Sequence, residues 1–156
     1  LEEALDEAKP YEKVLGTLAK VRLMQGDFKD AARLYELGRE KLGIGNSWRP
    51  GASEWMKGLA AAYVKLEDDE KLRDVLETVA KYEGDSLSVR KKLAEMALER
   101  GDMKAAGKWA LEGNFINVMD ADIHRILQKV YEDAGEEKKA AREKRVLAEI
   151  ESAEGK

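Results

Sequence analysis

The sequence predicts an all-α fold, in which about four helical hairpins stack into a right-handed α-α superhelix, that is, a solenoid. The first observation is a repeated segment: GDFKDAA begins at Gly26, GDMKAA at Gly101 and GEEKKAA at Gly135. The second is its spacing, because a degenerate copy at Glu67 lies 34 residues before Gly101, which itself lies 34 residues before Gly135. The third is a run of apolar residues at helical spacing on each side of every copy. A fixed period of this length is typical of helical repeat proteins.

The composition supports this fold class and excludes several functions. The 156 residues are 44% hydrophobic and 38% charged, which fits one helical body with solvated outer faces. The net charge of −4 argues against a nucleic-acid partner, since phosphate binding needs a basic surface. No run approaches the roughly 18 apolar residues of a membrane span, so we expect no membrane insertion. The absence of cysteine excludes thiolate metal sites and leaves the cellular compartment unpredicted.

The first hairpin is expected over about residues 11–43. Residues 1–10 indicate the tail of a preceding helix that ends at Pro10, and a chain that begins with Leu1 suggests a piece of a longer protein. Helices are predicted over 11–24 and 28–42. Gly26 ends the first of them and Asp27 is a good N-cap for the second. The repeat domain is expected to span 11–151, with 152–156 as a tail.

An insertion separates the first two hairpins. Gly26 and Glu67 lie 41 residues apart, seven more than the period, and the extra residues fall in GIGNSWRPG, from Gly43 to Gly51. Three glycines and a proline in this stretch predict a loop. Its aromatic residue, Trp48, is a candidate contact for a partner. Alternatively, Trp48 fills the wider gap between the first two hairpins, and we favour this second interpretation.

The remaining hairpins are expected over about 53–84, 86–117 and 120–151. In the third, the second helix is predicted to run from Met103 to about Leu111, after which Phe115 and Ile116 seal the turn. In the fourth, helices are predicted over 121–133 and 137–151. The last helix is expected to cap the stack, with Ala140, Ala141, Val146, Leu147 and Ile150 turned inward and Lys138, Lys139, Arg142, Glu143, Lys144 and Arg145 outward.

With these elements in place, the chain resembles the tetratricopeptide repeat (TPR) family. That family's 34-residue hairpin carries a Leu and a small residue, a bulky residue, a turn glycine and a packing alanine at fixed offsets. The matching residues are Leu18, Ala19, Gly26 and Ala31; Leu59, Ala60, Tyr63 and Leu72; Leu93, Ala94, Ala97, Gly101 and Ala106; and Leu127, Tyr131, Gly135 and Ala140. The pattern is degenerate at Arg22, Glu67, Leu72 and Gln128.

The resemblance implies that the first helix of each hairpin lines a concave groove that binds a protein or peptide. The groove positions that we expect to contact a partner are Lys13, Lys20, Met24, Lys57, Lys65, Lys91, Lys92, Arg125 and Lys129. The first two hairpins contribute the more basic part, so a peptide with an acidic end would prefer them. The alternative is that these cations are simply solvated. Chaperone binding is not expected, because the first helices lack the asparagine of the family's carboxylate clamp.

No catalytic, cofactor or metal site is expected. The segment from Gly84 to Leu87, GDSL, resembles the nucleophile block of the GDSL hydrolases, but a helix precedes it and no aspartate stands three residues before His124. A turn followed by a helix N-cap accounts for the same residues. His124, the single histidine, is expected to be a half-buried packing residue, because no other His or Cys could complete a metal site.

The sequence therefore predicts a non-catalytic module for protein-protein interaction or scaffolding, with a homodimer as one possibility. The alternative is the C-terminal repeat arm of a larger enzyme, for example a bacterial zinc peptidase, whose arms the segment 121–147 loosely resembles.

Overall fold

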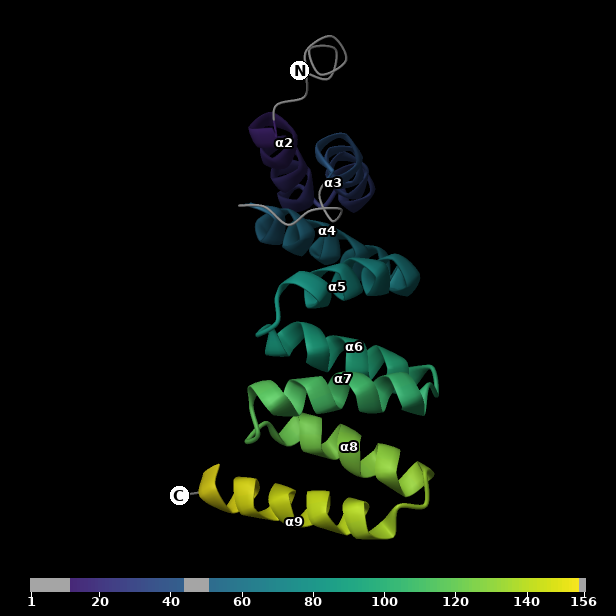
Figure 1. Cartoon of the computed structure of the whole chain (residues 1–156). Helices are drawn as coiled ribbons and strands as arrows, with labels where there is room; N and C mark the ends of the chain where they lie inside the picture. The colour runs from purple at the N-terminus through teal and green to yellow at the C-terminus, as the bar shows by residue number, and fades with distance from the viewer. Residues whose placement is uncertain (1–11, 44–50, 155–156) are drawn as a thin grey trace. The chain divides into compact units, whose positions relative to one another are not determined.

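The computed structural model describes residues 12–43 and 51–154, and its regular elements are all helices, which confirms the predicted fold class (Figure 1). In chain order they are α2 (Glu12–Met24), α3 (Phe28–Leu42), α4 (Ala52–Leu66), α5 (Asp69–Tyr82), α6 (Leu87–Glu99), α7 (Met103–Ile116), α8 (Ala121–Asp133) and α9 (Glu137–Glu154). Residues 1–10 and Trp48, for which the sequence made specific predictions, lie outside the described residues.

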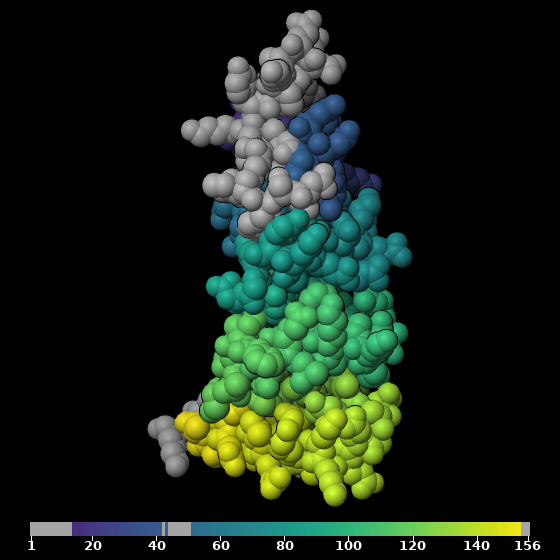
Figure 2. Space-filling view, viewed as in Figure 1, coloured from purple at the N-terminus to yellow at the C-terminus, as the bar shows by residue number. Residues whose placement is uncertain are grey.

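The helices form two compact units, which we call the N-terminal unit, ending at Tyr82, and the C-terminal unit, beginning at Glu83. Each unit holds two hairpins: α2 with α3 and α4 with α5 in one, α6 with α7 and α8 with α9 in the other. Within a unit, the second helix of one hairpin packs on the first helix of the next, and the two first helices also touch. Figure 2 shows side chains closing the space between neighbouring helices of the C-terminal unit. This is the packing by which solenoid repeats bury their apolar faces.

The repeated segment is the turn of each hairpin. Gly26, Gly101 and Gly135 have φ angles of 82°, 74° and 68°, and Glu67 adopts the same left-handed conformation with a φ of 55°. In all four turns the next amide donates to the carbonyl five residues earlier, for example Asp102 N to Ala97 O at 2.9 Å. This is the hydrogen bond of a Schellman C-cap. Asp27 and Asp102 then cap the following helices by accepting from the amides of Asp30 and Ala105.

Glycines and aromatic rings join the two hairpins of the N-terminal unit. The indole of Trp55 on α4 lies where a Cβ at Gly38 on α3 would be, 1.9 Å from its Cζ2. In return, the ring of Tyr35 on α3 occupies the space above Gly58 on α4. Trp55 Nε1 donates to the Tyr35 carbonyl at 2.8 Å, and the two rings meet edge to face with centroids 5.4 Å apart. The glycines therefore serve close helix packing, which the sequence pattern had not indicated.

The predicted end of α7 near Leu111 is wrong, because this helix continues to Ile116. Gly113 lies inside the helix and is buried against α8, where an added Cβ would come within 2.7 Å of Ile123 Cδ1. Phe115, expected to seal a turn, is 93% exposed on the last turn of α7. Gly113, which suggested the end of a helix, instead allows α8 to pack closely on α7.

The last helix also departs from its predicted faces. α9 continues to Glu154 rather than ending near Glu151. Ala140, Leu147 and Ile150 are buried as expected, whereas Ala141 is exposed. Glu143, predicted to face outward, is only 2% exposed. The helical stripe therefore runs through position 143, which lies three residues after Ala140 and four before Leu147.

Candidate partner-binding groove

The first helices of the N-terminal unit, α2 and α4, contact each other and carry an exposed face of apolar and basic residues. Met24 is 87% exposed and Val64 52%, and Lys20, Lys57 and Lys65 are also exposed. The structure therefore leaves these predicted groove lysines and Met24 open to solvent. Lys13 lies on α2, but its side chain is outside the described residues.

Free positive charge on this face is concentrated on α4. Lys20 approaches Glu54 of α4 with an Nζ to Oε2 distance of 3.7 Å, but the two side chains are 59% and 72% exposed, so the pair contributes little to stability. Lys57 and Lys65 form no ion pair within the described part of the chain. They are available to an acidic group of a partner.

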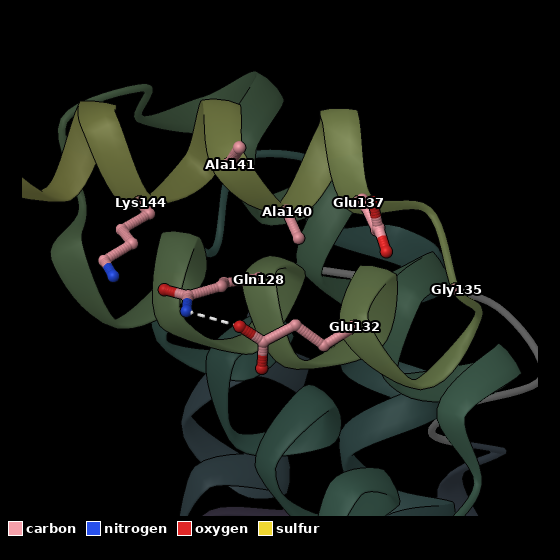
Figure 3. Close-up of a pocket in the computed structure, with 7 residues that line it drawn as sticks. All are labelled: Gln128, Glu132, Gly135, Glu137, Ala140, Ala141 and Lys144. Atoms are coloured by element: carbon pink, nitrogen blue, oxygen red, sulfur yellow. Dashed lines mark hydrogen bonds between the residues drawn. The ribbon is translucent and has the colours of Figure 1, made fainter.

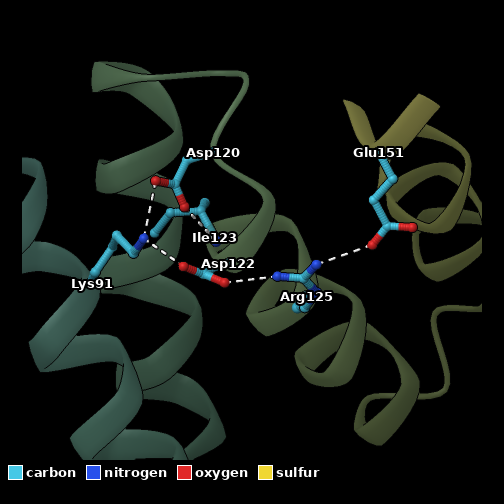
Figure 4. A network of polar contacts seen from close by, with 6 residues as sticks. All are labelled: Lys91, Asp120, Asp122, Ile123, Arg125 and Glu151. Carbon is cyan, nitrogen blue, oxygen red and sulfur yellow. Dashed lines mark hydrogen bonds and ion pairs between the residues drawn. The ribbon is translucent and has the colours of Figure 1, made fainter. Parts of the chain in front are cut away.

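In the C-terminal unit two of the four predicted groove cations, Lys91 and Arg125, belong to a network of polar contacts across three helices (Figure 4). Lys91 Nζ on α6 donates to Asp120 Oδ2 at 3.1 Å and to Asp122 Oδ2 at 2.6 Å. Arg125 on α8 joins Asp122 at 2.7 Å to Glu151 of α9 at 3.0 Å. Two of the expected partner-binding residues are thus engaged by carboxylates of their own unit, although the pairs of Arg125 are more than half exposed and contribute little to stability.

This network shifts the pKa values of its members in the directions that favour their charged forms. The hydrogen bond with Asp122 raises the pKa of Lys91, and the same bond holds the pKa of Asp122 below its ordinary value. Asp120 is in addition the N-cap of α8, accepting from Ile123 N at 3.1 Å. An acidic ligand would have to displace bound carboxylates to reach Lys91.

The other two groove cations of the C-terminal unit differ from each other. Lys92 is half-buried and lies 3.9 Å from Glu95 of its own helix. Lys129 is exposed and forms no ion pair with a described residue. Free lysine on the first helices is therefore denser on α4, with two, than on α8, with one.

His124 is buried rather than half-buried, which corrects the sequence expectation. It is 4% exposed, and its Nε2 lies 2.8 Å from the carbonyl oxygen of Val118. A carbonyl only accepts, so Nε2 carries a hydrogen. Nδ1 lies 2.6 Å from Oε2 of the equally buried Glu143, whose other oxygen accepts from Arg142 at 2.6 Å. The histidine thus joins α8 to α9 and to the preceding turn.

The segment from Gly84 to Leu87 forms the turn that leads into α6. Ser86 occupies the N-cap position, as the turn interpretation requires, although its side chain makes no capping hydrogen bond. Instead the buried Arg90 donates to the carbonyls of Glu83 and Ser86 at 2.7 and 3.2 Å. Two backbone carbonyls of this turn therefore accept hydrogen bonds from an arginine for which the sequence had indicated no role.

A surface hollow of about 360 Å³ lies where α8 turns into α9 (Figure 3). Gln128 and Glu132 line one side, where Gln128 Nε2 donates to Glu132 Oε1 at 2.7 Å, and Ala141 and Lys144 line the other. Glu132 and Lys144 are exposed, so they do not present a fixed set of polar groups. We assign no ligand to this hollow.

Among the described residues, no three His, Cys, Asp or Glu side chains are grouped so as to hold a metal ion. No helix in the same part of the chain combines the length and apolar character needed to cross a membrane.

Comparison with solved structures identifies the fold. MamA from Desulfovibrio magneticus RS-1 is similar with a TM-score of 0.64 and 16% identity, over 96% of this chain and 80% of that chain. A second MamA structure, MSR-1 C2, gives a TM-score of 0.68 at 17% identity, over 92% and 79%. BtubC (BKLC) from P. vanneervenii gives 0.60 at 22%, over 92% and 64%.

The fold is therefore that of a TPR-like helical repeat, the class to which MamA belongs. No family model matches the chain, and no curated protein sequence matches it. At these identities the likeness establishes architecture alone.

Proposed function

We propose that this chain is a non-catalytic protein-interaction module, and that the exposed face of α2 and α4 binds a peptide segment bearing acidic and apolar residues. The observation that carries the proposal is the contrast between the units. Lys57 and Lys65 are free beside the exposed Val64, whereas Lys91 and Arg125 are engaged by carboxylates of their own unit. Desolvating a free lysine against a ligand carboxylate costs no existing ion pair.

Support for a scaffold role also comes from the fold, because solenoid repeats present long surfaces formed by successive first helices. The named neighbours share that architecture. An apolar side chain such as Met24, 87% exposed at the end of α2, adapts readily to different ligand surfaces.

The test is binding of an acidic, leucine-containing synthetic peptide to the full chain, followed by fluorescence anisotropy. The double variant Lys57→Glu/Lys65→Glu is expected to weaken binding about tenfold, the equivalent of about 1.4 kcal/mol. The matched control is Lys29→Glu/Lys41→Glu, which makes the same charge change at exposed positions of the second helix α3. Equal loss in both variants would show that net charge, rather than this face, attracts the peptide.

The enzyme-arm alternative leads to a different result in solution. Light scattering over a concentration series would then show a tight dimer, and the peptide would not bind. A monomer that binds the peptide through Lys57 and Lys65 supports the interaction module.

A further inference from the structure

The C-terminal unit exposes four large apolar side chains near the end of its helix α7 and in the turn that follows it. Leu111 and Phe115 lie one turn apart near the end of α7, and Val118 and Met119 follow in the turn to α8. Their exposed fractions are 46%, 93%, 61% and 56%. We call these four residues the α7 patch. Large apolar side chains exposed close together in the chain are candidates for an interaction site.

The other repeats show that apolar residues are not required at these positions. Counted from the left-handed residue of each turn, Leu111 is the tenth residue and Phe115 the fourteenth. The equivalents of Leu111 are Glu36, Glu77 and Arg145, and those of Phe115 are Glu40, Lys81 and Glu149. Every equivalent position is charged, as expected of a solvated helix face. The third hairpin alone places a leucine and a phenylalanine there, so the repeat architecture does not explain them.

The core of the unit does not explain them either. The opposite side of the same turn of α7 is the packing side, where Gly113 meets Ile123 and where Ala106 and Ala110 are fully buried. Leu111 and Phe115 project from the helix away from that contact, which is why they remain exposed.

Along the exposed face of α7, two lysines precede the apolar residues in the chain. Lys104 and Lys108 precede Leu111 at spacings of seven and three residues, on the same side of the helix, and both are exposed. Neither forms an ion pair with any described residue, and Lys108 Nζ lies over the Trp109 ring, 4.0 Å from its centroid. The nearest acid on the helix, Glu112, is engaged by Arg90 at 3.5 Å. The face therefore offers two cations without an ion pair, followed by exposed apolar residues.

We propose that the α7 patch, together with Lys104 and Lys108, docks an acidic amphipathic helix of a partner protein. Leu111 and Phe115 lie one turn apart on α7, and Val118 and Met119 follow in the turn after it, so the patch offers several apolar contacts to the anchors at i, i+3 or i+4, and i+7 of a ligand helix. Glutamates at one end of that helix would meet the two lysines. Four side chains, only one of them almost wholly exposed, fall short of the ~800 Å² per partner in a stable protein dimer. The size therefore favours a single helix over a second copy of this chain.

This surface is separate from the proposed groove, since it lies on a second helix of the C-terminal unit. The experiment uses the full chain and a labelled synthetic helix with leucines at i, i+3, i+4 and i+7 and glutamates elsewhere. Two comparison peptides have the same composition in scrambled order, or lysines in place of the glutamates. Binding is measured by fluorescence anisotropy at low and high salt.

The principal variant, Leu111→Glu/Phe115→Lys, introduces the charges that α5 carries at the equivalent positions. We expect it to weaken binding of the glutamate helix at least tenfold, as loss of central apolar anchors does. Lys104→Glu/Lys108→Glu is expected to weaken binding about threefold or more at low salt and less at high salt. Lys29→Glu/Lys41→Glu, which makes the same charge change at exposed positions of α3, should leave the affinity unchanged. Phe115→Ser is the second variant in case the double replacement reduces the thermal midpoint.

Several results would overturn the proposal. These are no measurable binding of the glutamate helix, equal affinity for the scrambled or lysine peptide, or unchanged affinity in the principal variant. Loss of binding only in Lys57→Glu/Lys65→Glu would place the peptide in the groove, which contradicts this inference and leaves the proposed function intact. Light scattering that shows a dimer, abolished by Leu111→Glu/Phe115→Lys, would identify a second copy as the occupant and so overturn the choice of partner.

Discussion

Glu67 occupies a backbone position that three equivalent residues fill with glycine. Its φ of 55° lies in the left-handed region, where a side chain on Cβ costs roughly 1–2 kcal/mol relative to the right-handed one. The turn nevertheless forms, since its two capping amides, Glu67 N and Asp68 N, donate to the carbonyls of Val64 and Tyr63. The repeat geometry thus imposes the conformation on an unfavourable residue.

Replacing Glu67 by glycine should therefore stabilise the chain by about 1 kcal/mol, since the strain of the left-handed conformation is relieved. The free energy of unfolding, measured by urea denaturation, tests this. Glu70→Gly on the exposed first turn of α5 is the matched control and should destabilise by about 0.5–1 kcal/mol. Destabilisation by both changes would contradict the proposed origin of the strain.

A second prediction for a single residue concerns Glu143. Glu143→Leu should lower the free energy of unfolding by about 3 kcal/mol, because it leaves a buried histidine without its carboxylate partner. The double variant His124→Leu/Glu143→Leu should be more stable than Glu143→Leu, since the buried histidine that lost its carboxylate is removed and only the Val118 carbonyl loses a donor. A double-mutant cycle in urea measures the coupling. Additive effects would show that the two side chains do not stabilise each other.

At the scale of the elements, helices of the N-terminal unit approach closely because glycines face aromatic rings. Gly16, Gly38 and Gly58 lie inside helices, where glycine costs about 1 kcal/mol relative to alanine. Each faces Trp55 or Tyr35 in the neighbouring hairpin. Glycine lowers the intrinsic stability of these helices, but its lack of a side chain leaves the space that the two rings occupy.

Gly38→Ala should accordingly destabilise by about 1–3 kcal/mol despite the better helix propensity of alanine, because its Cβ would overlap Trp55. The same substitution made together with Trp55→Leu should cost much less than it does in the wild type. Gly84→Ala, where nothing lies within 4 Å of the added Cβ, is the control and should be close to neutral. Urea denaturation of these variants measures their free energies of unfolding. If Gly38→Ala destabilises the chain equally with Trp55 and with Leu at position 55, the overlap with the indole ring is not the cause.

At the scale of the whole molecule, the two proposed binding surfaces belong to different units. The groove candidates of the N-terminal unit lie on α2 and α4, with the free lysines on α4, and the α7 patch lies in the C-terminal unit. No residue is shared between the two surfaces, so occupying one removes no contact from the other. A module with two such surfaces would bridge two partners.

Saturating the α7 patch with the glutamate helix should therefore change the affinity of the groove for its acidic peptide by less than about twofold. Titrations with each peptide in the presence and absence of the other, followed by two different labels, measure this coupling. Mutual exclusion would show that both peptides use a single surface.

The local chemistry of the sequence determined the hairpins and their turns. The glycines and aspartates of the repeated segment have backbone and capping roles that depend only on neighbouring residues, which is why the positions of Gly26, Asp27, Gly101 and Asp102 followed from the pattern. Apolar spacing likewise located the buried faces of most helices. These features are local, and a repeated local pattern specifies a repeated local structure.

Tertiary contacts decided the environment of the residues for which the sequence pattern gave a wrong expectation. Gly113 continues a helix because Ile123 packs on it, and Glu143 is buried because His124 meets it from another helix. Lys91 and Arg125 resemble free groove residues in the sequence, yet carboxylates brought in from α8 and α9 engage them. Each of these outcomes depends on a partner 10 to 31 residues away along the chain, and no local pattern encodes that distance.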